Sequence, residues 1–227
     1  MKQDLRVQGW NFHKIQDSSV VITTLIFLIA LFGFVISMNF FTGLFLLIGI
    51  VLWGLVLYFF RDPDREIPKS PGIILSPGDG VVKDISKIQD NEQDHDRIQV
   101  GIFLSVFDVH VQRVPVSGKV KFITHQAGQY HPAFHPSAST ENEQIIMGID
   151  TEYGLVTVKQ ISGILARKCI NFLSEGDQIQ IGQRYGLIKF GSRVELVLPT
   201  TAKLICNIGD KVKGGLTSIA EIPLKED

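Results

Sequence analysis

The sequence predicts a mainly β protein, a flattened β-sandwich or barrel, preceded by an N-terminal transmembrane helical hairpin. Two observations lead to this fold class. Residues 18–60 contain no charged side chain, although charged residues make up 20% of the chain. From residue 73 onward the chain is a series of short runs rich in β-branched residues, most of them separated by Gly, Pro, Asn or Asp. Such runs are typical of antiparallel β domains.

The charge-free segment is about twice as long as the roughly 20 apolar residues that one helix needs to cross a bilayer core. We expect two spans, at about residues 20–38 and 44–60, because the turn-capable residues from Met38 to Gly43 interrupt the segment. A single over-long tilted helix is the structural alternative. A cleaved signal peptide is not indicated, since it would have one shorter apolar core and a small-residue cleavage site.

Basic residues flank the apolar segment on both sides, and they predict its orientation. Lysine and arginine are retained on the cytoplasmic side of a membrane protein, so both ends of the hairpin are expected in the cytoplasm, with the hairpin in the inner (cell) membrane. The predicted organisation is a cytoplasmic N-terminus (1–17), the hairpin (18–60), a proline-containing linker (61–72) and a β domain (73–227). The flanking residues are Lys2, Arg6 and Lys14 before the segment and Arg61, Arg65 and Lys69 after it.

Charge and cysteine content exclude two classes of protein. A net charge of -1 argues against a nucleic-acid-binding protein, which needs clustered positive charge. Two cysteines, Cys169 and Cys206, are too few for a disulfide scaffold, and we expect both to be buried thiols.

A Gly-Asp pair precedes an apolar run three times in the β domain, in SPGDGVV, SEGDQIQIG and NIGDKVKGG. Glycine allows a tight turn with positive φ, and aspartate accepts local backbone hydrogen bonds. Such turns resemble those of biotinyl and lipoyl carrier domains, which are flattened β-sandwiches. Lys189 lies near the comparable hairpin tip, but Ile188 and Phe190 replace the small or Met neighbours of a carrier lysine. A non-enzymatic, membrane-anchored carrier-like adaptor is therefore kept as the alternative function. Residues 164–172 are the best candidate for a short helix.

The hairpin tip itself, Gly191-Ser192, has the chemistry needed for cleavage of its own backbone. A Gly-Ser pair between strands is usually only a turn. However, the serine hydroxyl can attack the preceding carbonyl, and glycine has no Cβ to hinder it. Elimination from the resulting ester leaves dehydroalanine, which hydrolyses to a pyruvoyl group whose carbonyl condenses with an amine and acts as an electron sink.

This cleavage needs a base and an oriented peptide. His110 lies in a strand-like run, and Asp108 is expected on the same strand face. Asp79 sits in a predicted tight turn, and a buried aspartate can orient an imidazole for base work.

Three further histidines, His125, His131 and His135, open a different interpretation. The i,i+4 spacing of His131 and His135 is that of a metal pair on a helix, but Pro132 and Pro136 disfavour the helix. We expect no metal here and interpret the segment as a loop that touches a polar ligand. A membrane-tethered metallohydrolase is the third functional hypothesis.

Five segments, taken in order, resemble phosphatidylserine decarboxylase in its short, archaeal-type form. They are FFRDPDREIP, SPGDGVV, FLSVFDVHVQRVPVSGKV, the ENEQ segment and FGSRVELVLP. Each is a weak motif alone, but their order and spacing are specific. With the apolar hairpin, the resemblance covers nearly the whole chain.

The resemblance implies self-cleavage between Gly191 and Ser192, giving a β chain (1–191) and an α chain (192–227) that remain together as a heterodimer. Ser192 would become a covalent pyruvoyl cofactor. The substrate would be phosphatidylserine in the membrane, whose amine forms a Schiff base with the pyruvoyl carbonyl. Loss of CO2, protonation and hydrolysis would release phosphatidylethanolamine, a step of phospholipid biosynthesis. Asp79 and His110 match the family's Asp and His positions.

One position departs from the longer members of that family. They carry a second histidine three residues after the first, and here that residue is Arg113. His110 is therefore expected to serve in processing, in substrate protonation, or in both. Arg113 and Lys119 are expected on an aqueous rim, where they would hold the lipid phosphate. The sequence leaves room for a homo-oligomer.

Overall fold

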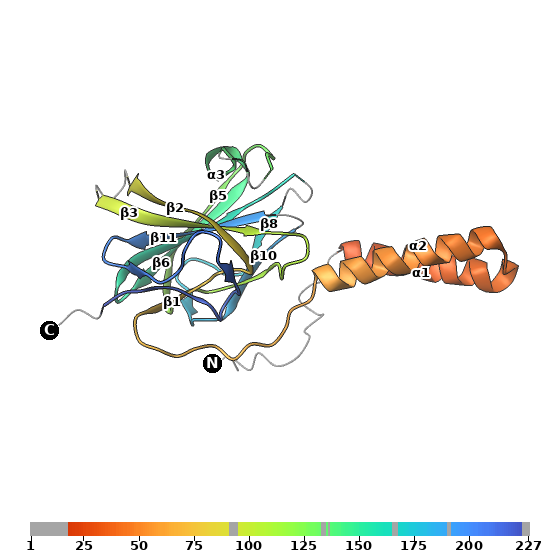
Figure 1. Ribbon diagram of the computed structural model, residues 1–227, viewed down its shortest axis with the longest axis horizontal. Coiled ribbons are helices and arrows are strands. Elements are labelled where there is room, and N and C mark those ends of the chain that lie inside the picture. Colours follow the sequence, from red (N-terminus) through yellow and green to blue (C-terminus); the bar gives the residue numbers. More distant parts are fainter. Residues whose placement is uncertain are drawn as a thin grey trace. The chain divides into compact units, whose positions relative to one another are not determined.

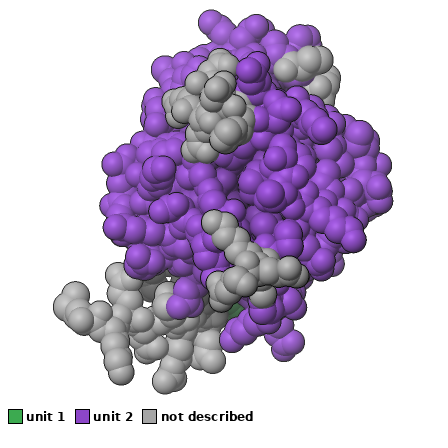
Figure 2. All heavy atoms as spheres, turned by 90° about the vertical axis from the view of Figure 1, so that its left-hand side faces the viewer, with its two compact units in different colours: residues 1–64 green, residues 65–227 purple. Residues whose placement is uncertain are grey.

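The computed structural model describes residues 18–90, 95–132, 135, 137–164, 168–189 and 192–223. The chain divides into two compact units, residues 1–64 and 65–227 (Figures 1 and 2). The division falls within the predicted linker at 61–72. Each unit is described by itself.

The first unit contains two apolar helices that lie side by side, α1 (Ser18–Ser37) and α2 (Phe40–Phe59) (Figure 1). Both are long and apolar enough to cross a membrane, which points to membrane association. The Phe27 and Trp53 rings stack with their centroids 4.9 Å apart, and the indole of Trp53 donates to the Thr24 hydroxyl at 3.1 Å. The segment thus forms two packed helices and not one long helix.

The turn between the helices is shorter than predicted. Only Met38 and Asn39 separate α1 from α2, and Met38 has a φ of 39°. The Asn39 side chain accepts from the Thr42 amide at 3.1 Å, while the Thr42 hydroxyl accepts from the Asn39 amide at 3.2 Å. This reciprocal cap satisfies donors of the first helical turn, so α2 begins at Phe40 and not near residue 44.

The second unit is an antiparallel β domain of three sheets, which confirms the predicted fold class. Its strands are β1 (Ile73–Leu75), β2 (Gly80–Asp90), β3 (His95–Leu104), β4 (Val111–Arg113), β5 (Gly118–Gln126), β6 (Gln144–Thr151), β7 (Gly154–Ile161), β8 (Cys169–Asn171), β9 (Gln178–Ile179), β10 (Arg184–Ile188), β11 (Ser192–Pro199), β12 (Lys203–Leu204), β13 (Lys211–Val212) and β14 (Ser218–Glu221). A single-turn helix, α3 (Ala138–Glu141), precedes β6.

The largest sheet has eight strands in the order β13-β2-β3-β11-β7-β6-β5-β9 and curls on itself (Figure 1). Two three-stranded sheets, β4-β10-β8 and β1-β14-β12, complete the domain. Strand β11 is central in the large sheet. It pairs with β3 along its whole length, from Ser192 opposite Leu104 to Pro199 opposite Arg97, and with β7 from Arg193 opposite Ile161 to Val197 opposite Thr157.

Alternate residues of β11 form the middle of the hydrophobic core. Val194, Leu196 and Leu198 are fully buried and belong to the same core cluster as Val100 and Ile102 of β3. Complete burial of such a side chain contributes about 1.5–3 kcal/mol. This alternation fixes which face of β11 each residue occupies.

The predicted helix at residues 164–172 is wrong over its described C-terminal part. Cys169–Asn171 forms β8, which pairs with β10 from Cys169 opposite Ile188 to Asn171 opposite Gly186. Residues 165–167 lie outside the described part of the chain. Because the middle residue of β8, Ile170, is β-branched and its backbone pairs with Leu187, the sheet overrides the weak helical pattern.

Two of the three Gly-Asp pairs form the predicted turns. Gly176 and Gly209 have φ angles of 88° and 97°. The aspartate after each accepts from a backbone amide three residues earlier, at 2.8 Å in both cases: Asp177 from Ser174 and Asp210 from Asn207. The third aspartate, Asp79, has long-range partners instead.

Because Leu196 is fully buried in the central strand, replacing Leu196 by Ala should lower the free energy of unfolding of the domain by about 2–5 kcal/mol. Urea denaturation of the detergent-solubilised chain would measure the change. The matched control is Ile208→Ala, since Ile208 is 62% exposed and its loss should cost about 0.5 kcal/mol or less. Equal losses for the two variants would contradict the assigned core.

Candidate functional site

Ser192 is the first residue of β11, and it is fully buried. Its side chain lies on the same face of the strand as Val194, the core face. Among the described residues, no group forms a hydrogen bond with the Ser192 hydroxyl. A buried hydroxyl without a partner costs free energy, so this serine does not serve the stability of the fold. Gly191, the predicted cleavage partner, lies outside the described residues.

Both neighbouring strands approach Ser192. Leu104, the last residue of β3, is its direct partner. On the other side Arg193 pairs with Ile161, so the antiparallel register brings Ser162, the residue after β7, next to Ser192. Ser162 is also fully buried.

His110 lies on the segment between β3 and β4 and is fully buried. Its Nδ1 is 2.9 Å from the carbonyl oxygen of Asp108. A carbonyl only accepts, so the proton of the neutral ring is assigned to Nδ1 and the lone pair to Nε2. This is the tautomer that a general base requires.

The prediction that Asp108 shares a strand face with His110 is wrong. Strand β4 begins only at Val111, and Asp108 lies in a turn. Its carboxylate accepts from the amide and the hydroxyl of Ser105, each at 2.8 Å. Asp108 thus orients the imidazole through its main chain and not through its carboxylate.

A pair of glutamines connects β7, which pairs with the strand of Ser192, to β4, the strand that follows His110. The Gln160 amide donates to the Gln112 side-chain oxygen at 2.7 Å. Gln160 pairs with Val194, two residues after Ser192, while Gln112 comes two residues after His110. The contact shows that β7, the neighbour of β11, meets β4 between the eight-stranded sheet and the β4-β10-β8 sheet.

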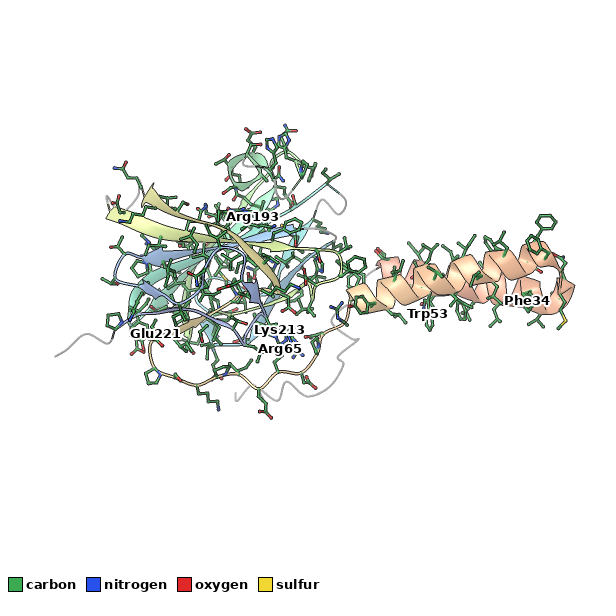
Figure 3. All side chains as sticks on the ribbon, viewed as in Figure 1. Phe34, Trp53, Arg65, Arg193, Lys213 and Glu221 are labelled. Atoms are coloured by element: carbon green, nitrogen blue, oxygen red, sulfur yellow. The ribbon has the colours of Figure 1, made fainter. Side chains whose placement is uncertain are left out.

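Asp79 is nearly buried, and its partner is an arginine. Arg65 donates to both carboxylate oxygens, at 2.6 and 2.9 Å, and the Gly214 amide donates to one of them at 2.8 Å. Arg65 is labelled in Figure 3. In the sequence, Arg65 appears as a flanking basic residue and as part of the FFRDPDREIP segment, and neither pattern indicates its pairing with Asp79. The predicted action of Asp79 on an imidazole stays a prediction.

The turn that carries Asp79 nevertheless lies against the strands around Ser192. A Cβ added to Gly78 would be 3.5 Å from the Leu104 side chain and 3.8 Å from the Val194 side chain. The Pro77 carbonyl also accepts from the Arg113 amide at 2.9 Å, in the strand that follows His110. The elements that carry Asp79, His110 and Ser192 therefore meet in one region.

Arg113 and Lys119 do not share a rim. Arg113 is only 3% exposed and donates to the Gly182 carbonyl at 3.2 Å. Lys119 is exposed on β5, in the eight-stranded sheet, whereas Arg113 is in the β4-β10-β8 sheet. Lys119 lines a shallow pocket of about 270 Å³ with Lys121 and Asp150. Their contact with a lipid phosphate stays a prediction, and the burial of Arg113 weighs against it.

The histidine segment pairs with carboxylates. His131 lies 2.9 Å from Glu141, His125 lies 3.0 Å from Glu143, and the rings of His131 and His135 stack at 5.8 Å. Within the described ranges, no three His, Cys, Asp or Glu side chains form a group suited to a metal ion.

Asn142 ties this segment to the neighbourhood of Ser192. Its side chain accepts from the His131 amide and donates to the carbonyls of His131 and Ser162, all at 2.8 Å. Asn142 is fully buried. In the sequence, Asn142 is only one letter of the ENEQ motif. In the structure, its side chain holds the His131 main chain beside Ser162, the residue that follows β7.

Comparisons with known proteins agree on one family. The family model described as phosphatidylserine decarboxylase matches residues 52–220. A phosphatidylserine decarboxylase proenzyme from Carboxydothermus hydrogenoformans is 40% identical over 81% of this chain and 86% of its own length. The chain belongs to the phosphatidylserine decarboxylase family. Relatives with the same printed name include proteins of Amoebophilus asiaticus, 41% identical over 78% of both chains, and Parabacteroides distasonis, 38% identical over 77% of this chain and 81% of the relative.

Membership of the phosphatidylserine decarboxylase family confirms the resemblance seen in the sequence and the expectation of a decarboxylase enzyme. The relatives are named proenzymes, a word that denotes a precursor awaiting processing.

The cysteines of this phosphatidylserine decarboxylase family member are poor nucleophiles. Both are buried free thiols, as predicted. Burial, and secondarily the charge of Glu143, raises the pKa of the Cys169 thiol, and burial also raises the pKa of Cys206. Both thiols are therefore protonated at neutral pH, which does not support cysteine-based chemistry.

Because of this burial, Cys169 should resist alkylation by iodoacetamide in the native protein at about pH 8 and react fully in urea. Its pKa is higher in the folded than in the unfolded state. The contribution of the Cys169 thiol to the free energy of unfolding should therefore be constant below about pH 8. It should become unfavourable as the pH rises above the pKa of the thiol in the unfolded chain. Mass spectrometry of the alkylated peptide is the measurement. Equal alkylation rates in buffer and in urea would contradict the assigned burial.

A second prediction concerns Arg65, whose side chain is 5% exposed beside an Asp79 side chain that is 12% exposed. Arg65→Met should destabilise the domain by about 3–5 kcal/mol, because it leaves a buried carboxylate without its cation. The double variant Arg65→Met/Asp79→Leu should lose less than the sum of the two single changes. Urea denaturation of all three variants tests this, with Lys69→Met on the exposed linker as the control. Strict additivity would show that the pair does not interact.

Proposed function

We propose that this chain converts phosphatidylserine to phosphatidylethanolamine and CO2 by means of a pyruvoyl group that it makes from Ser192. The observation that carries the proposal is the buried hydroxyl of Ser192, which has no hydrogen-bond partner among the described residues and stands at the first position of the central strand. Family membership and the printed names of the relatives support the substrate.

The surroundings of Ser192 fit such a group. The residue is held by strand pairing, while its side chain is shielded from solvent and has no hydrogen-bond partner within the described part of the chain. A pyruvoyl group supplies a carbonyl that condenses with the substrate's amine and then delocalises the electron pair that remains on the substrate carbon when CO2 leaves. Residues 192–199 of β11 would hold the group, because they anchor its chain between β3 and β7.

Formation of the group begins with the Ser192 hydroxyl. Its oxygen bonds to the Gly191 carbonyl carbon, the peptide C–N bond breaks, and the Ser192 nitrogen gains a proton, which leaves an ester. Elimination removes the Cα proton of residue 192 to a base, breaks the Cβ–Oγ bond and frees the Gly191 carboxylate. Hydrolysis of the remaining dehydroalanine by water then releases ammonia. The products are a β chain (1–191) and an α chain (192–227), held together as a heterodimer.

His110 moves the protons in this proposal. Its Nδ1 is held by the Asp108 carbonyl at 2.9 Å, so Nε2 is the nitrogen that takes the hydroxyl proton during processing. During turnover the same nitrogen would deliver a proton to the substrate carbon that has lost CO2. Burial keeps the ring out of bulk water, which strengthens its interaction with charge that develops nearby.

The two apolar helices fit a substrate that is a membrane lipid. Basic residues on both flanks of the hairpin favour an orientation with the β domain in the cytoplasm, at the inner membrane.

Ser192→Ala should abolish self-cleavage, because the attacking oxygen is missing. Intact mass under denaturing conditions should show one full-length chain for the variant, and two chains for the native protein, the small one beginning at residue 192 with a blocked N-terminus. The variant should form no phosphatidylethanolamine from vesicles of phosphatidylserine and phosphatidylcholine. Ser218→Ala, on half-buried β14 in another sheet, is the control and should be processed normally. A cleaved Ser192→Ala chain would refute the proposal, and an uncleaved native chain would favour a non-catalytic adaptor.

A further inference from the structure

Arg193, the residue after Ser192, is the centre of a charged network on the opposite face of β11. Its guanidinium donates to both oxygens of Asp84 at 2.6 Å each, and its Nε donates to Glu195 at 2.7 Å. Lys159 lies 3.5 Å from the other Glu195 oxygen, and the Ser139 hydroxyl donates to Glu195 as well. The network contains two cations and two anions, so its charge is balanced. Arg193 is labelled in Figure 3.

The backbone around Arg193 is shaped to admit this contact. The register of β2 shifts between Val82 and Asp84, so one extra residue turns the Asp84 side chain to the face of Arg193. Gly101 of the intervening strand β3 leaves the space that the guanidinium crosses. A Cβ at Gly101 would lie 2.2 Å from an Arg193 nitrogen and 2.6 Å from an Asp84 oxygen. Two independent backbone features therefore serve one side-chain contact.

The network also crosses the bond at which the chain is proposed to be cut. Asp84, Ser139 and Lys159 precede that bond, whereas Arg193 and Glu195 follow it. After cleavage the contacts of Asp84 with Arg193, and of Lys159 and Ser139 with Glu195, would join the two new chains, while the contact between Arg193 and Glu195 would lie within the α chain. All of its β11 members lie within four residues of the new N-terminus.

We propose that Arg193, clamped by Asp84 and Glu195, is a positioning residue that keeps residue 192 in register after the 191–192 bond is broken. This inference rests on the proposed function. Cleavage turns the first residue of a central strand into a chain end, and chain ends fray. Charge-assisted, bidentate contacts at the second residue oppose that fraying more strongly than the strand's neutral backbone bonds alone. Residue 192 is thereby held where His110 and the substrate can meet it.

The test uses Asp84→Asn in the full chain, because Asp84 is the most exposed partner in the clamp, with 40% of its side chain accessible, and asparagine preserves its shape. Intact mass should show that this variant is still cut into two chains. Turnover of phosphatidylserine in mixed vesicles should then fall about 10- to 100-fold in kcat with KM little changed, because the reactive residue is misplaced while substrate binding is kept. Amide hydrogen exchange should accelerate about tenfold or more at residues 193–195 and not at 197 and 198.

The matched control is Arg97→Met. Arg97 is also buried, at 3% exposure, and it also donates to β11, but at the far end of the strand, to the carbonyls of Val197 and Leu198. The Arg97→Met variant should lose exchange protection at residues 197 and 198 and keep kcat within about threefold of the native value. Gly101→Ala is a second route to the same result, since its Cβ displaces the guanidinium without changing any charge. It should reproduce the kcat loss and the local exchange of Asp84→Asn.

Native kcat and native exchange at 193–195 in cleaved Asp84→Asn and Gly101→Ala would overturn the inference. A folded Asp84→Asn chain that stays uncut would overturn it too, because the clamp would then act before cleavage and not after it. If Asp84→Asn does not fold, the Gly101→Ala result decides by the same criteria. A native chain that is never cut refutes the proposed function instead, so the two failures are distinguishable.

Discussion

The pairing of β11 between β3 and β7 is the constraint on which the rest of the β domain depends. Ladders on both sides leave the strand no freedom to slip, because a shift of one residue would exchange its two faces. Ser192 is the first residue of the strand and pairs with Leu104 of β3, and the ladder to β7 begins one residue later, at Arg193. Ser192, the residue proposed to react, thus stands at the beginning of the central strand of the large sheet.

The two faces of β11 have different tasks. On one face Val194, Leu196 and Leu198 supply the core. On the other, Arg193 and Glu195 form a balanced charge network with residues of three other elements. If apolar residues replaced Arg193 and Glu195, the strand would be equally buried. Apolar packing has no preferred direction, however, so it would fix the position of Ser192 less closely. Bidentate ion pairs add direction at the position next to Ser192.

Local patterns were sufficient for much of the architecture. Absence of charge over residues 18–60 predicted two apolar helices, and β-branched runs predicted the β domain. Two Gly-Asp turns formed as expected, since their hydrogen bonds span only three residues. The short helix at 164–172 failed because pairing with β10 outweighs weak local propensity. The helix boundary at Phe40 was missed because a capping interaction of Asn39 and Thr42 decides it.

The candidate site shows the same difference between what local sequence indicates and what distant pairing decides. Ser192 and His110 were recognisable because serine after glycine and a histidine in an apolar run carry their chemistry in their own side chains. The partners of these residues were not. Asp79 meets Arg65, His110 is oriented by a main-chain carbonyl, and Arg193 reaches Asp84 across an intervening strand, 109 positions away in the chain. Reactive groups can be named from residue type and neighbours, but their electrostatic partners depend on strand order, a register shift and a glycine gap, which exist only once distant segments have paired.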